Sequence, residues 1–436
     1  MSRDRMNRSD PRFDRSMAWL ARARKVVPGA AQTLSKGPEM FVEGAYPAFL
    51  EWGRGCRVWD VDGHEYVDYI MGLASITLGY AYPAVTEQVA RQLERGSIFS
   101  LPHPLEVEVS ERLTEVIPCA EMVRFVKTGS EANAAAVRVA RAATGRDLVL
   151  VCGYAGWHEW YAVTTPRSKG IPKELSDLVG PFEYNDLASL EAQLVAHHGR
   201  VAAVIMEPVL LDPPAPGFLE GVKAAARRHG ALLIFDEIVS GFRWARGGAQ
   251  EHFSVAPDLA TFGKGMANGL PLAAVVGGRE LMRQFEDIFV SSTFGGDTLA
   301  LAGCLATLEV YRSQPVIEHL WRMGRRFQQG FAGLAARLGV PALAVGYPVH
   351  PKIVIDHRSA ETRRLLMSLF LQETAARGVI FHLAGFNISY SHAEADVDET
   401  LQACEAALRV VGDALSDGRV GERLRGKPYV EAFRRS

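Results

Sequence analysis

Lys264 is the residue of this chain whose type and setting most favour covalent chemistry. It stands between two glycines, which leave space around its amine, and apolar side chains such as Phe262 and Met266 flank it. An amine that is desolvated, or that lies near a cationic ring, loses proton affinity and becomes a nucleophile toward aldehydes. The alternative is an exposed loop lysine without a chemical role, but the apolar neighbours favour burial and argue against it.

A second group of residues is suited to bind phosphate. A predicted strand at residues 123–126 runs into Gly129 and Ser130, and an alanine-rich helix follows as far as about residue 144. Gly129 allows a ligand to approach the backbone closely, and Ser130 adds a hydroxyl beside the free amides of the first helical turn. The alternative is that Ser130 only caps the helix.

A third feature is the predicted strand at residues 232–235, which ends in Asp236 and Glu237. Acids at a strand end also hold the metal of P-loop ATPases, but the GxxxxGK[ST] motif of those proteins is absent, so the sequence disfavours ATP hydrolysis. A carboxylate at a buried strand end needs a partner, and a protonated ring nitrogen would be one. Helix capping by Asp236 is the simpler alternative.

Tyr154 directly follows the predicted strand at residues 148–151. Its ring is suited to stack on a planar ligand, although packing explains it equally well. The strand ends thus supply, in chain order, a phosphate site, a stacking aromatic, an acid and an amine. Enzymes that use pyridoxal 5′-phosphate pair a Schiff-base lysine with an acidic partner for the ring nitrogen. We therefore expect Lys264 to hold this cofactor as a Schiff base.

These groups need a sheet whose strands end at a common edge. The predicted strands are residues 123–126, 148–151, 201–205, 232–235, 273–276 and 288–291. Helical stretches between several of them, such as residues 219–228, imply a largely parallel sheet that is covered on both faces. In sheets of this kind, ligands bind where the strands end.

The two ends of the chain predict a smaller lobe. Asp62 and Gly63 lie between alternating runs, which predicts a hairpin over residues 57–68. The last third predicts strands at residues 351–355, 378–381 and 388–390 and a final helix near residues 397–411. We therefore expect a large cofactor-binding domain at residues 76–310 and a small domain built from residues 1–75 and 311–436.

The composition is that of a globular protein without a strong charge. The 436 residues include 48 Lys+Arg and 50 Asp+Glu, which leaves no electrostatic basis for binding nucleic acid or a membrane. Residues 1–4 open a polar stretch without the apolar segment of a signal peptide, and no apolar run approaches the ~20 residues of a membrane span. The five scattered cysteines lack metal-binding spacing, so we expect reduced thiols, no metal site and a cytoplasmic protein.

The sequence resembles the class-III aminotransferases, a group of pyridoxal-phosphate enzymes of fold type I. Glutamate-1-semialdehyde aminomutases and ω-aminotransferases belong to this group. The shared motifs are residues 128–133 (Thr-Gly-Ser-Glu-Ala-Asn), 206–208 (Met-Glu-Pro), 236–243 (Asp-Glu-Ile-Val-Ser-Gly-Phe-Arg), 263–265 (Gly-Lys-Gly) and 292–296 (Ser-Thr-Phe-Gly-Gly). The resemblance implies an α/β fold with a mostly parallel seven-stranded sheet in the large domain and a small α+β domain from both chain ends.

The resemblance also implies the residues that hold the cofactor and a homodimer whose active sites are shared. The implied roles are phosphate binding for Gly129 and Ser130, contact with the two ring faces for Tyr154 and Val239, pairing with the pyridinium nitrogen for Asp236, hydrogen-bonding support for Glu207, Schiff-base formation for Lys264, and phosphate binding across the dimer interface for Thr293. Lys264 and Asp236 are the two catalytic residues among them.

Two departures from the aminomutases bear on the reaction. Lys36 stands where they have an arginine that takes the substrate carboxylate, and lysine lacks the planar fork that grips a carboxylate with two bonds. Residues 157–161 and 169–172 also replace a Gly/Ser-rich gating loop that would trap the intermediate of aminomutation. The sequence therefore favours transamination between a small amine or amino acid and an oxo acceptor, with an intramolecular aminomutase as the alternative.

Substrate contacts are predicted from residue type alone. The candidates are Lys36, Trp157 and His158, and the cluster around Trp157 is equally compatible with a packed core. Such a mixed surface suits a biosynthetic or sugar-like oxo substrate. A third hypothesis is a protein of this fold that binds the cofactor without catalysis, and the presence of both Lys264 and Asp236 argues against it.

Overall fold

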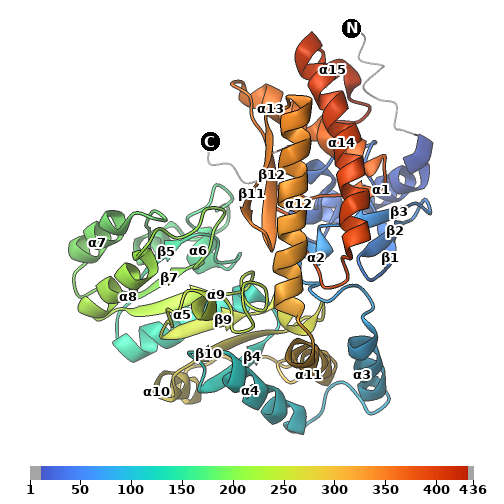
Figure 1. Cartoon of the computed structure of the whole chain (residues 1–436). Helices are drawn as coiled ribbons and strands as arrows, with labels where there is room; N and C mark the ends of the chain where they lie inside the picture. Colours follow the sequence, from blue (N-terminus) through green and yellow to red (C-terminus); the bar gives the residue numbers. More distant parts are fainter. Residues whose placement is uncertain (1–10, 431–436) are drawn as a thin grey trace. The chain divides into compact units, whose positions relative to one another are not determined.

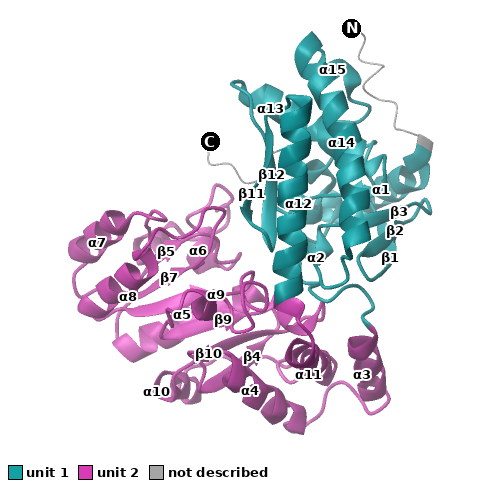
Figure 2. Cartoon of the chain, in the orientation of Figure 1, with its two compact units in different colours: residues 1–82, 318–434 teal, residues 83–317, 435–436 magenta. Residues whose placement is uncertain are grey.

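The computed structural model describes residues 11–430 of the chain (Figure 1). The polar start predicted at residues 1–4 lies outside the described residues. The chain divides into two compact units, which Figure 2 colours separately. Unit 1 takes both ends of the described chain, up to Tyr82 and from Glu318 on, and unit 2 takes residues 83–317. The domain boundaries predicted after residues 75 and 310 stay a prediction.

Unit 2 contains a seven-stranded sheet in the order β4-β10-β9-β8-β7-β5-β6. The strands are β4 (Met122–Val126), β5 (Leu148–Cys152), β6 (Val179–Pro181), β7 (Val201–Met206), β8 (Leu232–Asp236), β9 (Leu259–Phe262) and β10 (Ala273–Gly277). All neighbours are parallel except β10, which runs antiparallel to both β4 and β9. β5, β7 and β10 are buried at every residue, as expected for strands covered on both faces.

Helices cover this sheet. The α-helices of unit 2 are α3 (Pro83–Leu93), α4 (Pro104–Val116), α5 (Gly129–Thr144), α6 (Glu159–Ala162), α7 (Leu187–Ala196), α8 (Phe218–Arg228), α9 (Ala249–His252), α10 (Arg279–Met282) and α11 (Thr298–Ser313). α5 packs against β7, β9 and β10, α8 packs against β8, and α11 packs on α3 and α4. α5 ends at Thr144, in agreement with the predicted end near residue 144. The left-handed backbone of Gly145 (φ 64°) stops the helix there.

The predicted strand at residues 288–291 was wrong, because this segment has no strand partner. Arginine side chains take its carbonyl oxygens instead of a neighbouring strand. Arg138 Nη1 donates to Phe289 O at 2.6 Å, and Arg124 Nη2 donates to Val290 O at 2.7 Å. The segment is therefore fixed across β4 and α5 as irregular backbone.

Unit 1 holds two smaller sheets, with strand orders β1-β2-β3-β13 and β11-β12. Its elements are α1 (Asp14–Val26), β1 (Leu50–Arg54), β2 (Arg57–Asp60), β3 (Glu65–Asp68), α2 (Met71–Ala74), α12 (Val316–Leu338, which enters this unit at Glu318), β11 (Ala342–Tyr347), β12 (His350–Ile355), α13 (Ala360–Ala375), β13 (Val379–Ile380), α14 (Glu394–Asp417) and α15 (Val420–Arg423). The hairpin predicted at residues 57–68 is β2 and β3, with Gly63 at φ 91° in its turn.

The strand predicted at residues 388–390 is absent. The Tyr390 amide donates to Thr77 O at 2.7 Å, and the preceding amide of Asn387 donates to Tyr69 O at the same distance. Both bonds lie outside any ladder of paired strands. The secondary structure of a short apolar run cannot be predicted without knowing which segment it bonds to. Here it bonds to irregular backbone.

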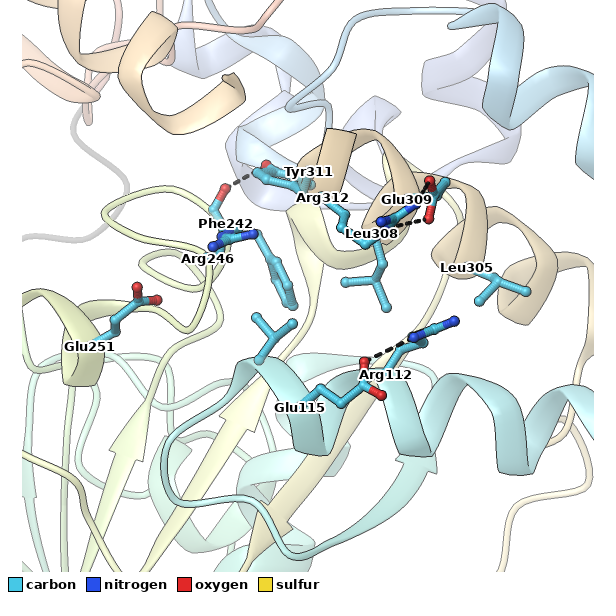
Figure 3. A pocket seen from close by; sticks show the side chains of 11 residues that line it. Arg112, Glu115, Phe242, Arg246, Glu251, Leu305, Leu308, Glu309, Tyr311 and Arg312 are labelled. Carbon is cyan, nitrogen blue, oxygen red and sulfur yellow. Dashed lines mark hydrogen bonds and ion pairs between the residues drawn. The ribbon is translucent and has the colours of Figure 1, made fainter. Parts of the chain in front are cut away.

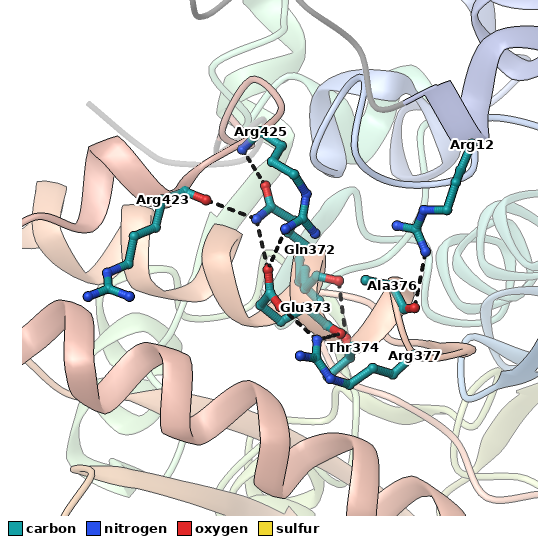
Figure 4. A network of polar contacts seen from close by, with 9 residues as sticks. Arg12, Gln372, Glu373, Thr374, Ala376, Arg377, Arg423 and Arg425 are labelled. Atoms are coloured by element: carbon teal, nitrogen blue, oxygen red, sulfur yellow. Dashed lines mark hydrogen bonds and ion pairs between the residues drawn. The ribbon is translucent and has the colours of Figure 1, made fainter.

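A polar network ties both chain ends of unit 1 to the last turns of α13 (Figure 4). Buried Glu373 forms ion pairs with Arg377 (2.6 Å) and Arg425 (3.0 Å). Burial raises the pKa of Glu373, but these arginines and Gln372 outweigh it and leave the pKa below its ordinary value. Arg12 donates to Ala376 O at 3.1 Å. The network joins residues more than 350 positions apart in the sequence.

Candidate active site

Five strands of unit 2 direct their carboxyl ends to the same edge of the sheet. β5, β7, β8 and β9 are mutually parallel, and β4 runs in the same sense because antiparallel β10 lies between it and β9. The residues that end or follow these strands are Gly129 and Ser130 after β4, Tyr154 after β5, Glu207 after β7, Asp236 at the end of β8 and Lys264 after β9. This is the edge at which α/β sheets bind ligands.

The start of α5 offers free amides for an anion. Thr128 caps the helix, because its Oγ1 accepts from the Glu131 amide (3.3 Å) while Glu131 Oε2 accepts from the Thr128 amide (3.0 Å). Ser130 is therefore not the cap. The amides of Gly129 and Ser130 are the first two of the helix and have no acceptor within it. We call these two amides the cradle. A Cβ on Gly129 would lie 3.0 Å from the Ile238 side chain, so a larger residue at this position would require that side chain to shift.

The loop after β5 packs directly on this cradle. The Trp157 amide donates to Oγ of the buried Ser130 at 3.2 Å. Gly156 has φ 102°, and a Cβ there would come within 2.5 Å of Ser130 Oγ. The loop therefore approaches the cradle so closely that it needs a glycine at this position.

Asp236 is buried and receives a hydrogen bond on each carboxylate oxygen. Asn133 Nδ2 donates to Oδ2 at 2.6 Å, and the Ile238 amide donates to Oδ1 at 3.0 Å. Burial raises the pKa of Asp236, and these donors and the Lys264 amine oppose the rise. Asn133 is held in turn by Thr261, whose hydroxyl donates to Asn133 Oδ1 at 2.7 Å. Neither Asn133 nor Thr261 was predicted as a site residue.

Glu237 has a different task from Asp236, although the two are adjacent. Side chains of successive strand residues point to opposite faces. Glu237 accepts from the amides of Ala249 (2.7 Å) and Gln250 (2.8 Å) and from the Ser240 hydroxyl. It therefore fixes the loop between β8 and α9 rather than the ligand edge.

Lys264 and Glu207 share the buried edge with Asp236. Burial lowers the pKa of the Lys264 amine, and the carboxylates of Glu207 and Asp236 oppose this. Burial, and then the charge of Asp236, raises the pKa of Glu207, while the Tyr154 amide donates to Glu207 Oε1 at 2.8 Å. Lys264 itself has a left-handed backbone (φ 43°), which is uncommon outside glycine and concentrates at functional sites. Its amine loses a proton more easily than an ordinary lysine.

The aromatic cluster after β5 divides into exposed and packed members. Tyr154 is 57% exposed and Trp157 is 70% exposed, whereas Trp160 and Tyr161 pack partly against the core of unit 2. The Tyr161 hydroxyl donates to Gly153 O at 3.2 Å and its ring meets the Tyr154 ring edge-on. The hypothesis of a packed core therefore holds for the second pair only.

Three further predicted residues lie in other parts of the structure or on its surface. Val239 is half-buried three residues after Asp236, and Thr293 is exposed in the irregular segment before α11. The end of that segment is fixed to the connection between β4 and α5, because Lys127 Nζ pairs with Asp297 Oδ2 at 3.0 Å. Lys36 belongs to unit 1. Burial raises the pKa of Asp68 in that unit, and the charge of Lys36 is one of the influences that oppose the rise. The predicted contact of Lys36 with substrate stays a prediction.

A separate cavity of about 350 Å³ opens elsewhere in unit 2, between α4, α11 and the loop after β8 (Figure 3). Arginines and glutamates surround it, and two of these, Arg312 and Glu309, pair with each other at its rim. None of the predicted site residues lines it. The chemistry predicted from the sequence therefore lies at the strand ends and not in this cavity.

The groups at the strand ends match the parts of pyridoxal phosphate. The free amides beside Gly129 suit its phosphate, the carboxylate of Asp236 suits a protonated ring nitrogen, and the amine of Lys264 suits its aldehyde. The chemistry of these groups, which gather first-turn amides, a hydrogen-bonded carboxylate and an amine of lowered pKa at one edge of the sheet, is the observation that tests this fit. Residues 42–408 match the sequence profile of the family described as aminotransferase class-III.

The chain belongs to the class-III aminotransferases. It is 36% identical to a 3-aminobutyryl-CoA aminotransferase of Cloacimonas acidaminovorans, over 91% of this chain and 97% of that one. It is 35% identical to a glutamate-1-semialdehyde 2,1-aminomutase of Syntrophobacter fumaroxidans, with the same coverage. The solved PLP internal aldimine form of the FumI protein from Sphingopyxis sp. MTA144 has a TM-score of 0.88 at 26% identity, covering 95% of this chain and 99% of that one.

This aminotransferase is therefore an enzyme that uses pyridoxal 5′-phosphate and transfers an amino group between small molecules. The predicted α/β architecture of fold type I, with its mostly parallel seven-stranded sheet, is confirmed. The non-catalytic hypothesis fails on the same findings. Between residues 11 and 430, no helix is both long and apolar enough to cross a membrane.

Proposed function

We propose that this class-III aminotransferase moves an amino group from a small amine or amino acid to a separate oxo acceptor, with Lys264 and Asp236 as its catalytic residues. The observation that carries the proposal is the Lys264 amine, which interacts electrostatically with the carboxylates of Glu207 and Asp236 at the edge where α5 presents its free amides. The half-reaction, followed through the cofactor spectrum with a panel of amines and amino acids, would identify the donor.

Each side chain of the site has a definable task in binding. When bound, pyridoxal phosphate supplies an aldehyde that condenses with amines and a ring that accepts electrons from the substrate carbon. The amides of Gly129 and Ser130 hold the phosphate, Tyr154 and Val239 cover the two ring faces, and Glu207 supports the ring by hydrogen bonding. Asp236 keeps the ring nitrogen protonated, because two hydrogen-bond donors hold its buried carboxylate in place and favour its anionic form.

Lys264 both retains the cofactor and moves a proton. Its Nζ would hold the cofactor in the resting enzyme. Once released from the cofactor, Nζ would take a proton from the amine-bearing carbon of the substrate. An amine whose pKa is lowered by burial is neutral more often at physiological pH, and only the neutral amine can accept that proton.

Borohydride reduction followed by peptide mass spectrometry tests the role of Lys264. We expect a pyridoxyl group on Lys264, and we expect Lys264→Ala to lose turnover while it still folds and binds some cofactor. A reduced enzyme that carries no pyridoxyl group on Lys264 would overturn the proposal. Circular dichroism of the variant separates loss of the amine from loss of the fold.

Transamination is proposed ahead of aminomutation because the loop after β5 is tethered. Residues 159–162 form the helical turn α6, the Trp157 amide binds Ser130, and Tyr161 binds Gly153. In place of a free Gly/Ser-rich gating loop, this chain therefore has a loop that carries aromatic side chains and is anchored by hydrogen bonds. To test this, the pyridoxamine form of the enzyme is mixed with glutamate-1-semialdehyde. Internal exchange of the amino group without release of an oxo product would favour the aminomutase instead.

The surroundings of the site support three further parts of the proposal. Trp157 and His158 contact a substrate with both apolar and polar groups, as a biosynthetic or sugar-like oxo compound has. Two chains form a homodimer, and Thr293 reaches the phosphate in the partner's site. Exposed Phe289 (86%) and Phe294 (58%), which flank Thr293, support such an interface. A cytoplasmic location is supported by five cysteines that are all unpaired.

A further inference from the structure

Two buried polar side chains of unit 2 form a chain of hydrogen bonds that ends on Asp236. The Thr261 hydroxyl donates to Asn133 Oδ1 at 2.7 Å, and Asn133 Nδ2 donates to Asp236 Oδ2 at 2.6 Å. Both Thr261 and Asn133 are almost completely buried. Thr261 lies on β9, Asn133 in the first turns of α5 and Asp236 at the end of β8, so three separate elements meet in this chain.

The chain of hydrogen bonds has a fixed direction. An ionised carboxylate only accepts, so Asp236 faces the amide nitrogen of Asn133. The amide oxygen of Asn133 only accepts, and it takes the proton of the Thr261 hydroxyl. If the Asn133 amide turned over, its oxygen would face a carboxylate oxygen. The Ile238 amide serves the other oxygen of Asp236. Donors directed at both oxygens favour the anionic carboxylate over the neutral acid.

We propose that Thr261 and Asn133 are positioning residues that act on the reaction through Asp236. They hold its carboxylate anionic and correctly oriented, so that the proton shared with the ring nitrogen stays on the nitrogen. Neither residue reaches the cofactor in this proposal, and Thr261 acts only through Asn133. The inference rests on the proposed pairing of Asp236 with the ring nitrogen.

The affinity of the apoenzyme for the cofactor tests this positioning role without any turnover. The two probes are pyridoxal phosphate and its analogue with a carbon atom in place of the ring nitrogen, with affinity followed by fluorescence quenching. Both probes form the same covalent bond to Lys264 and present the same phosphate, so the ratio of their dissociation constants isolates the ring nitrogen. We expect the wild type to prefer pyridoxal phosphate by at least ~10-fold, as for a hydrogen bond between charged groups.

The variants Thr261→Val and Asn133→Leu remove the two donors and approximately keep the shape of the side chains. Asn133→Leu should lower the preference ~10-fold, and Thr261→Val should lower it ~3-fold or more, because Asn133 is then less firmly held. Affinity for the carbon analogue should stay within about twofold, and Thr261→Ser, which keeps the hydroxyl, should restore the preference. In the Asn133→Leu background, Thr261→Val should change nothing further.

Two outcomes would contradict the proposal in different ways. If a variant weakens both probes equally, or if Thr261→Val keeps the full preference, the two residues are structural and the positioning role fails while that of Asp236 stands. If the wild type itself shows no preference, the pairing of Asp236 with the ring nitrogen fails. Thr261→Val is the milder change, so it remains testable if Asn133→Leu does not fold.

Discussion

At the scale of single residues, the charges of Lys264, Glu207 and Asp236 depend on one another. Burial disfavours the charged form of all three, which raises the pKa of both acids and lowers that of the amine. The two acids also repel each other, since the charge of Asp236 raises the pKa of Glu207. A ligand with a cationic ring would relieve this repulsion. The site is therefore electrostatically suited to the cofactor that its family uses.

The charge of Asp236 is expected to matter more than its shape. Asp236→Asn keeps the size of the side chain and can still accept from the Ile238 amide, but it removes the negative charge. We expect kcat/KM with the best donor to fall ~10²–10³-fold, the usual loss for one preorganised electrostatic group. Unchanged thermal unfolding of the apoenzyme is the control. A variant within a few-fold of wild-type activity would show that Asp236 does not have the catalytic role assigned to it.

Glu207 is expected to make the apoenzyme less stable as the pH rises. Its pKa is raised from the ordinary 4.5 to about 7, so the folded protein holds this proton more firmly than the unfolded chain. Its stabilising contribution is complete below pH 4.5 and is lost as the pH rises through 7. As the pH rises from 5 to 8, the free energy of unfolding of Glu207→Gln should therefore rise relative to that of the wild type, by roughly 2 kcal/mol.

The thermal unfolding midpoint of both apoproteins, measured at each pH, checks this difference. Glu220→Gln on α8 removes an exposed glutamate and controls for the loss of one charge. If the midpoints of Glu207→Gln and the wild type keep a constant separation from pH 5 to 8, Glu207 does not titrate as proposed.

The sequence predicted the identity of the reacting residues better than their mutual contacts. Asp236 and Gly129 are visible as unusual residues at predicted strand ends, and Lys264 is visible from its two glycine neighbours and its apolar flanks. The contact between Asn133 and Thr261 joins positions 128 residues apart, and no local pattern reveals it. One feature of the site does have a local signal in the sequence. Thr128 and Glu131 have the spacing of a capping box, which identifies Thr128 as the helix cap instead of Ser130.

At the scale of elements, the strands that the sequence missed are short or contain residues that disfavour strands. β6 is Val-Gly-Pro, and proline is tolerated there because β6 lies at the edge of the sheet. β9 has four residues and is recognisable only from its pairing with β8 and β10. Without β9, the position of Lys264 at the common edge does not follow from the sequence. The long buried runs of β5, β7 and β10 were predicted well because both of their faces are apolar.

The cap of α5 is expected to support phosphate binding specifically. Thr128→Ala removes the acceptor for the Glu131 amide and loosens the turn that presents the Gly129 and Ser130 amides. We expect pyridoxal phosphate to bind about fivefold more weakly, equivalent to a cap of about 1 kcal/mol. Pyridoxal, which lacks the phosphate, should bind as it does to the wild type, and Thr128→Ser should behave normally. Equal weakening of both ligands would mean that the cap matters for the fold and not for the phosphate.

At the scale of the whole molecule, the question is what covers the irregular segment before α11. Its backbone is fixed by Arg124, Arg138 and the ion pair of Lys127 with Asp297, yet Phe289 and Phe294 stay exposed. Backbone that is held this firmly with its aromatic side chains outward is typical of a surface that another chain covers. The proposed homodimer would cover these exposed side chains and would bring Thr293 to the phosphate site of the partner.

Separation of the subunits should therefore weaken cofactor binding. The double variant Phe289→Asp and Phe294→Asp places charges in the proposed interface. Sedimentation at micromolar concentration should show the mass falling from twice 47.7 kDa to 47.7 kDa. Pyridoxal phosphate should also dissociate more readily, because each site loses Thr293 of its partner. Val195→Asp is the matched control, since Val195 is 65% exposed on α7 and lies outside the segment. A double variant that keeps the wild-type mass, or a wild type that sediments as a monomer, would contradict the shared site.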